Sequence, residues 1–369
     1  MFARISKFLF LGTFLLASCD SVPAEESPQK TSTNEAGKQP KNIILLIGDG
    51  MGLTQITAGM IANGNHLELE RFPYVGLIKT SSSDDLITDS AAGATAFSTG
   101  EKTYNGAIGV DAEKNPKETI LEIAAENNLK TGLVATSSIT HATPASFFAH
   151  QPSRSMDEAI AMDMVSAPVD FFVGGGKDFF GNREDGLNLL DSLKNNGFQI
   201  FDGVTAISVD GEAKVAGFIA PKQPKSMLDG RGNILQEASE KALNYLDNDK
   251  GFFLMIEGSQ IDWAGHGNDS DGIIAEMIDF DKAIKEVLDF AEKDGNTLVI
   301  VTADHETGGY SITGGDKGGK IEGAFSTTHH TPALIPVFAY GPGADKFAGI
   351  YENTAIFDKM LELMNKGKE

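Results

Sequence analysis

The sequence is poor in cysteine and in positive charge, and each shortage excludes something. Cys19 is the only cysteine among 369 residues, so no disulfide can form within the chain. Lysine and arginine total 30 against 52 aspartates and glutamates, which gives a formal net charge of −22. No basic stripe is available to neutralise a nucleic-acid backbone, so nucleic acid is not expected as the main partner. An anionic substrate would need a locally positive site, and metal ions would provide one.

The N-terminus lacks a hydrophobic run long enough to span a bilayer. The stretch "MFARISKFLFLGTFLLASCDS" has a basic start, an apolar run through Leu16 and small residues before Cys19. This pattern indicates a signal peptide over residues 1–18. "LASC" resembles a lipobox, so we expect acylation of Cys19 and an exported lipoprotein, periplasmic or at the cell surface. The alternative is an ordinary export signal with a bystander cysteine.

The rest of the chain divides into a tether and one folded domain. Residues 19–40 are polar and free of aromatics, which is typical of a flexible tether. After residue 41 there is neither an internal repeat nor a break in composition, so we expect a single catalytic domain over 41–369.

Apolar runs alternate with helical patterns along this domain. Buried strands are expected at 42–47, 131–136, 252–256, 297–303 and 335–341, and helices at 116–127, 234–247 and 270–293. This alternation predicts an α/β fold in which a mostly parallel sheet is covered on both faces, a three-layer α/β/α sandwich.

Polar side chains follow three of the predicted strands. Asp49 comes after "NIILLIG", Glu257 after "FFLMI", and Asp304 and His305 after "TLVIVTA". Ligands of open parallel sheets bind beyond the carboxyl ends of strands. Three strands therefore bring four candidate metal ligands to one edge, whereas any one of them alone would be an ordinary polar loop residue.

Two further stretches add histidines. In "EGSQIDWAGHGND", Asp262 and His266 are spaced i, i+4, so both project from one face if the segment is helical. The alternative is a helix N-terminus with an incidental histidine. "TTHHTPAL" contributes His329 and His330. Mixed carboxylate and imidazole ligands suit zinc, and all-oxygen ligands suit magnesium.

The stretch "TDSAAGATAFSTG", residues 88–100, allows two interpretations. Asp89 or Ser90 is an N-cap of a closely packed helix, or Ser90 is a nucleophile at a helix N-terminus, where backbone N–H groups favour an anion.

Five motifs together resemble those of alkaline phosphatases, in the same order and over almost the whole chain from residue 41. They are "NIILLIGDGMG", "TDSAAGATAFSTG", "EGSQIDWAGHGND", "VTADHETGG" and "HHTPALIPVFAYGPGA". The resemblance implies broad hydrolysis of phosphate monoesters, with an alkaline optimum, through a phosphoserine at a site of two Zn²⁺ and one Mg²⁺. It also implies a homodimer.

The resemblance assigns roles by motif. Ser90 matches the nucleophile, Arg154 of "HQPSRSM" matches the arginine that grips phosphate, and Asp89 matches an orienting residue. The first zinc is assigned Asp262, His266 and His330. The second, which also contacts the Ser90 oxygen, is assigned Asp49, Asp304 and His305. Magnesium is assigned Asp49, Glu257 and Thr143.

Three positions depart from the bacterial pattern or stay outside it. His141 stands where many bacterial members have aspartate beside the magnesium site, which invites zinc or another divalent metal there. Trp263 replaces a lysine, so we expect weaker binding of the phosphate product. His329 is expected to support His330 without binding metal itself.

Two other classes of function compete with this interpretation. Sulfatases, phosphodiesterases and cofactor-independent phosphoglycerate mutases are related metalloenzymes. Ser90 is followed by "AAGAT", which does not fit the sulfatase motif, and phosphodiesterases lack the Arg154 clamp. A tethered phosphate- or metal-binding lipoprotein without turnover would be expected to lose the nucleophile or a ligand, and this chain retains both.

Overall fold

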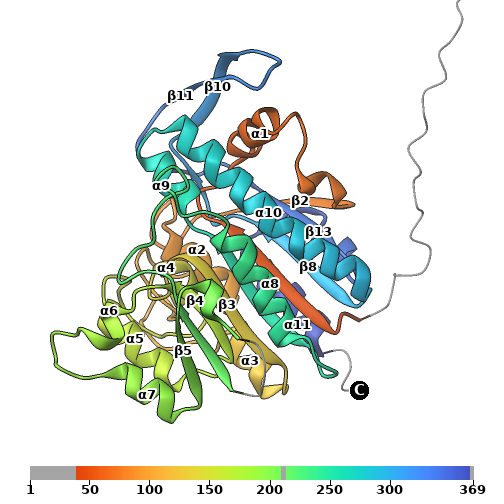
Figure 1. The fold of residues 1–369 in the computed structure, drawn as a ribbon. Coiled ribbons are helices and arrows are strands. Elements are labelled where there is room, and N and C mark those ends of the chain that lie inside the picture. Colours follow the sequence, from red (N-terminus) through yellow and green to blue (C-terminus); the bar gives the residue numbers. More distant parts are fainter. Residues whose placement is uncertain (1–38, 209–212, 366–369) are drawn as a thin grey trace, which may run out of the picture. The chain divides into compact units, whose positions relative to one another are not determined.

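The apolar runs of the sequence form the middle of a ten-stranded sheet (Figure 1). The computed structural model describes residues 39–208 and 213–365, which all belong to one compact unit. The predicted signal peptide, Cys19 and the tether up to residue 38 lie outside the described residues. Within the described part, β13 is the one strand of the sheet that runs antiparallel to its neighbours.

The strand order puts the strands of the candidate site near the centre. In spatial order the strands are β14 (Gly349–Glu352), β2 (Tyr74–Lys79), β13 (Ile335–Tyr340), β8 (Thr297–Thr302), β1 (Asn42–Gly48), β7 (Phe252–Gly258), β3 (Lys130–Ser138), β4 (Phe171–Gly175), β6 (Lys214–Phe218) and β5 (Phe198–Asp202).

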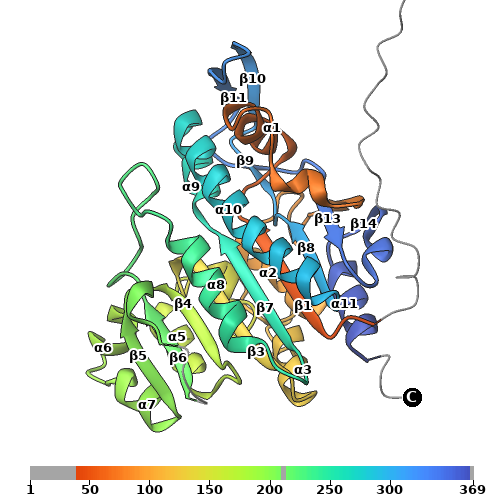
Figure 2. The same cartoon turned by 45° about the vertical axis from the view of Figure 1, so that its right-hand side comes forward.

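Helices cover both faces of this sheet, which confirms the predicted three-layer α/β/α sandwich (Figures 1 and 2). One face carries α8 (Ile234–Leu246) and α10 (Ser270–Asp294), and the other carries α2 (Ser90–Thr99), α3 (Ile120–Glu126) and α11 (Ala355–Asn365). The remaining helices are α1 (Leu53–Ala62), α4 (Ala142–Ala145), α5 (Asp157–Ser166), α6 (Asp178–Gly181), α7 (Leu189–Asn195) and α9 (Gln260–His266), with 3-10 turns η1 (Glu68–Arg71), η2 (Val204–Ala206) and η3 (Ala344–Phe347).

Local sequence accounts for these elements. Strands β1, β7 and β8 are buried at every position, and their middle residues are apolar, because helices cover both faces of the sheet there. Helix α10 begins where the Asp269 side chain accepts from the N–H of Gly272 and ends at Gly295 in the left-handed conformation. Helix α3 starts at Ile120, later than predicted, because Thr119 and Glu122 form a capping box there.

Two small antiparallel pairs lie outside the large sheet. β10 (Tyr310–Gly315) and β11 (Ile321–Phe325) form a hairpin that projects from the body (Figure 2). β9 (Glu306–Thr307) pairs with β12 (His330–Thr331), which brings His330 back beside the segment that follows β8. No helix among the described residues is long and apolar enough to cross a membrane.

Candidate metal centre and nucleophile

The carboxyl ends of the central strands meet at one edge, as the sequence predicts. β1 is parallel to both β7 and β8, with Ile47 opposite Glu257 on one side and Thr302 on the other. Asp49 therefore lies just beyond the level of Glu257, and the backbone N–H of Gly50 donates to Oδ1 of Asp304 at 3.2 Å. All three carboxylates are fully buried.

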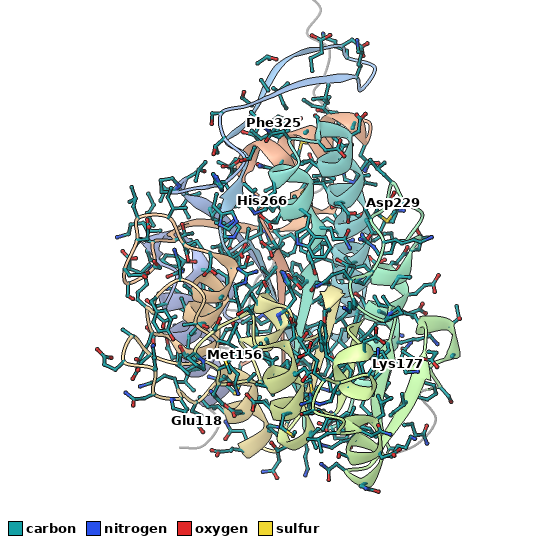
Figure 3. The ribbon with its side chains drawn as sticks, turned by 90° about the vertical axis from the view of Figure 1, so that its left-hand side faces the viewer. Glu118, Met156, Lys177, Asp229, His266 and Phe325 are labelled. Atoms are coloured by element: carbon teal, nitrogen blue, oxygen red, sulfur yellow. The ribbon has the colours of Figure 1, made fainter. Side chains whose placement is uncertain are left out.

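The first cluster joins α9 to β12. Asp262 and His266 both lie on α9, which confirms the predicted helix. The Nε2 atoms of His266 and His330 are 3.0 Å apart, and each is 3.4 Å from Oδ1 of Asp262. Figure 3 shows His266 near the base of the projecting hairpin, where Phe325 lies.

The second cluster surrounds Ser90. Asp49, Asp304 and His305 have ligand atoms within 4.8 Å of one another. Nε2 of His305 is 3.2 Å from Oδ2 of Asp304 and 3.3 Å from Oγ of Ser90, and the Ser90 hydroxyl donates to Oδ1 of Asp49 at 3.5 Å. His305 also lies close enough to Asp262 and His330 to group with them.

The third cluster places His141 beside the carboxylates. Asp49, His141 and Glu257 have ligand atoms within 4.8 Å of one another, so the imidazole belongs to the group itself. Thr143 is buried in α4, two residues after His141. The ring of Trp263 meets that of His141 edge-on, with centroids 5.7 Å apart.

Ser90 is the first residue of α2, and of the two interpretations of its stretch the structure confirms the helix cap. Asp89 is the N-cap, and its Oδ1 accepts from the N–H of Ala92 at 3.0 Å. Its Oδ2 accepts from Nη1 of Arg154 at 3.0 Å. Asp89, Ser90 and Arg154 line one pocket of about 340 Å³, with Asp262, His266 and His330. The pocket thus combines a hydroxyl, a guanidinium and the first cluster.

Several buried carboxyl groups lie close together in the site, and this raises the pKa values of three of them. Burial raises the pKa of Glu257 to about 7, and burial with the nearby Asp262 raises the pKa of Asp304 to about 6. Burial and then Asp304 raise the pKa of Asp49. Burial lowers the pKa of His141 to about 3, with Arg154 acting in the same direction. Such shifts concentrate at functional sites, and cations would favour the ionised carboxylates and neutral imidazoles.

The donor atoms fit divalent metals. Oδ2 of Asp49, Nδ1 of His141 and Oε1 of Glu257 are buried without a hydrogen-bond partner, which costs roughly 1–3 kcal/mol for each atom unless something else compensates. Nδ1 of His266 and Nδ1 of His330 are paired with backbone carbonyl oxygens, at 2.6 and 2.9 Å. Each Nδ1 therefore carries the ring proton, and the Nε2 atom of each ring keeps a free lone pair. Both Nε2 atoms face the Asp262 carboxylate, an arrangement suited to zinc.

Three residues next to the clusters show how far the sequence predicts the side chains that surround the candidate ligands. His329 is exposed and lines the pocket, while its neighbour His330 points into the cluster. Glu306 and Thr307 were not predicted as site residues. Glu306 is a buried carboxylate that accepts from Gln55, from Thr331 and from two N–H groups of the next turn. The one available signal was their place in "DHETGG", directly after Asp304 and His305.

A buried serine at a helix start, beside clusters of carboxylates and imidazoles at the edge of a parallel sheet, is the arrangement of a metal-dependent hydrolase. Comparison with known proteins specifies the family. The family model for alkaline phosphatase matches residues 40–324.

Individual relatives agree with this match. Alkaline phosphatase 3 of Bacillus subtilis is 44% identical over 79% of this chain and 66% of its own length. Alkaline phosphatase 4 of the same organism is 35% identical over 92% of this chain and 93% of its own. The structure of the alkaline phosphatase from the Antarctic bacterium TAB5 superposes with a TM-score of 0.85 at 49% identity, covering 89% of this chain and 98% of that one. The chain belongs to the alkaline phosphatase family and is a phosphatase that hydrolyses phosphate monoesters at a metal site.

Proposed function

We propose that the chain is a broad-specificity phosphomonoesterase that acts through a phosphoserine on Ser90, with an alkaline optimum. The observation that carries this proposal is that Ser90 Oγ lies within 3.5 Å of both His305 and Asp49 and shares its pocket with Arg154. A hydroxyl at its ordinary pKa is a weak nucleophile. It therefore needs neighbouring groups, here Asp49, His305 and any metal they hold, that favour loss of its proton.

Ser90, Arg154 and Asp89 each have a part in this reaction. Arg154 presents a planar guanidinium that fits two phosphate oxygens, and Asp89 holds its other edge. The Ser90 oxygen attacks phosphorus, the ester oxygen leaves, and water then attacks the phosphoserine to release inorganic phosphate and free Ser90. The first two clusters would each hold Zn²⁺, which when bound stabilises the attacking and leaving oxygens and activates water.

The third cluster is proposed to hold Mg²⁺, or Zn²⁺ or another divalent metal because of His141. Asp49 and Glu257 supply oxygens, Thr143 lies beside them, and the imidazole of His141 is a ligand that Mg²⁺ disfavours. A TAB5 variant with a histidine replaced by aspartate has magnesium bound in its M3 site. His141→Asp in this chain is therefore expected to raise magnesium content at the expense of zinc, measured by elemental analysis.

The proposal includes the setting of the enzyme. Acylated Cys19 would tether the exported domain to a membrane as a homodimer, periplasmic or at the cell surface. Trp263 places an uncharged ring beside His141 instead of a cation, which supports weak product binding. Small phosphate monoesters are the substrates.

The test compares hydrolysis of p-nitrophenyl phosphate, bis-p-nitrophenyl phosphate and p-nitrophenyl sulfate at pH 9 after chelation and return of zinc and magnesium. Dominant monoesterase activity that zinc restores supports the proposal. Ser90→Ala must abolish it and prevent phosphorylation of the protein, as read by mass spectrometry. Ser98→Ala, which removes a buried hydroxyl from the same helix, serves as the control. Dominant diester or sulfate cleavage would refute the proposal.

A further inference from the structure

Thr307 lies between the first and second clusters and is held there by its backbone. It is fully buried in β9, opposite His330 of β12. Its N–H donates to the carbonyl of Gly50 at 3.2 Å, and its own carbonyl accepts from Nε2 of Gln55 at 2.8 Å. The side chain therefore has little freedom to move relative to either cluster.

Two glycines leave room for this side chain. A Cβ on Gly50 would come within 2.9 Å of Thr307 Oγ1, and a Cβ on Gly265 would come within 2.9 Å of Thr307 Cβ. Both distances are shorter than side chains tolerate. Gly50 belongs to "GDGMG" after β1 and Gly265 to "WAGHG" on α9, so two separate motifs converge on Thr307.

The Thr307 hydroxyl bonds to one candidate ligand from each cluster. Oγ1 lies 2.5 Å from Oδ1 of Asp262 and 3.2 Å from Nδ1 of His305. A threonine hydroxyl has one proton, and an ionised carboxylate can only accept, so that proton goes to Asp262. His305 must then donate from Nδ1.

This assignment fixes the direction of the His305 ring. With its proton on Nδ1, the lone pair of Nε2 faces Ser90 Oγ at 3.3 Å and the Asp304 carboxylate at 3.2 Å. The same hydroxyl holds the Asp262 oxygen that faces His266 and His330. One side chain thus orients a ligand on each side.

We propose that Thr307 is a positioning residue that couples the two zinc sites, so that loss of its hydroxyl weakens both together. This rests on the proposed function, because it takes the two clusters as zinc sites. Partners of metal ligands typically contribute 10- to 100-fold to metal affinity. Thr307→Val, which keeps the shape and removes the hydroxyl, is expected to bind two zinc equivalents about 10- to 100-fold more weakly and therefore to release them faster.

The experiment follows transfer of zinc from the zinc-loaded full chain to a chelating dye, without substrate. Thr307→Ser keeps the hydroxyl and should restore retention, and Thr307→Ala is a second variant without it. Thr297→Val is the matched control, because Thr297 Oγ1 donates to Asp294 at 2.7 Å and accepts from Asn42 at 3.0 Å at the opposite end of β8. It should retain zinc as the unchanged protein does.

Other outcomes would overturn the proposal. Faster loss of a single equivalent would refute the coupling, and unchanged loss from Thr307→Val and Thr307→Ala would refute the positioning role. Equal loss from Thr307→Ser would show that packing matters and the hydroxyl does not. If the unchanged protein takes up no zinc when it is loaded, the proposed zinc sites themselves are refuted. This outcome is seen before any variant is compared, so it is distinguished from failure of the role proposed for Thr307.

Discussion

Asp89 and Arg154 form an ion pair of 3.0 Å through which the start of helix α2 is joined to the guanidinium of the pocket. The second oxygen of the same carboxylate caps that helix at Ala92. Burial would lower the pKa of Arg154, but the charge and hydrogen bond of Asp89, together with the charges of Asp49 and Asp262, raise it above its ordinary value. Asp89 therefore connects the placement of Ser90 with that of Arg154.

Asp89→Ala should weaken both functions of this carboxylate. Loss of an N-cap costs about 0.5–2 kcal/mol, which thermal unfolding would detect. A freed Arg154 would grip phosphate less firmly, so the inhibition constant of inorganic phosphate should rise several-fold. Thr119→Ala removes the cap of α3, away from the pocket, and should lower stability without this rise. An inhibition constant equal to that of the unchanged protein would contradict the assigned role.

Arg154→Lys keeps the charge but loses the planar fork. Losing one charge-assisted hydrogen bond to phosphate costs about 1.5–3 kcal/mol, or about 10- to 150-fold in kcat/KM. Steady-state kinetics with p-nitrophenyl phosphate would measure this. Arg183→Lys changes another arginine with a buried side chain, outside the pocket, and should leave kcat/KM unaltered. Equal kinetics for Arg154→Lys would show that only its charge matters.

Gly50→Ala should damage the metal centre, whereas Gly64→Ala should not. Both glycines have positive φ, at 77° and 72°, so both substitutions carry about 1–2 kcal/mol of backbone strain. A Cβ at Gly50 would come within 2.7 Å of the Asp262 backbone, while a Cβ at Gly64 meets nothing within 4 Å. Elemental analysis should find zinc lost only from Gly50→Ala. Full zinc content in that variant would contradict the close approach.

Asp281 makes stability depend on pH. Burial raises its pKa to about 7, although its side chain accepts from the N–H of Glu68 in η1. Because the folded pKa exceeds the unfolded value, near 3.9, this residue's stabilisation is complete below about pH 4 and is lost as pH rises through about 7. Asp281→Asn should match the unchanged protein near pH 4 and exceed it near pH 8.

The size of this difference follows from the shift, and should be on the order of a few kcal/mol at most. Denaturant unfolding at both pH values would measure it. The exposed Asp289, also on α10, provides the comparison as Asp289→Asn. A gain from Asp281→Asn that is equal at pH 4 and pH 8 would exclude titration as the cause.

The sequence predicts the central layer well and its surroundings less well. Strands β1, β7 and β8 each have an apolar middle with an acidic residue at or just beyond the C-terminal end, so both their burial and their polar ends can be predicted from the residues. The edge strand β5 and the hairpin β10–β11 carry no such run, because each is covered on one side at most. Nor could residue types place Thr307 between Asp262 and His305, since that depends on a pairing of β9 with β12 far along the chain.

The distribution of the clusters along the chain has a consequence for biosynthesis. Their residues are spread from Asp49, directly after β1, to His330 on β12, and the pairing of β9 with β12 closes the first cluster. A nascent chain that ends before His330 lacks one of the three side chains of the first cluster, however much of its sheet has formed. If the first cluster holds zinc as proposed, its complete coordination has to follow synthesis of nearly the whole domain.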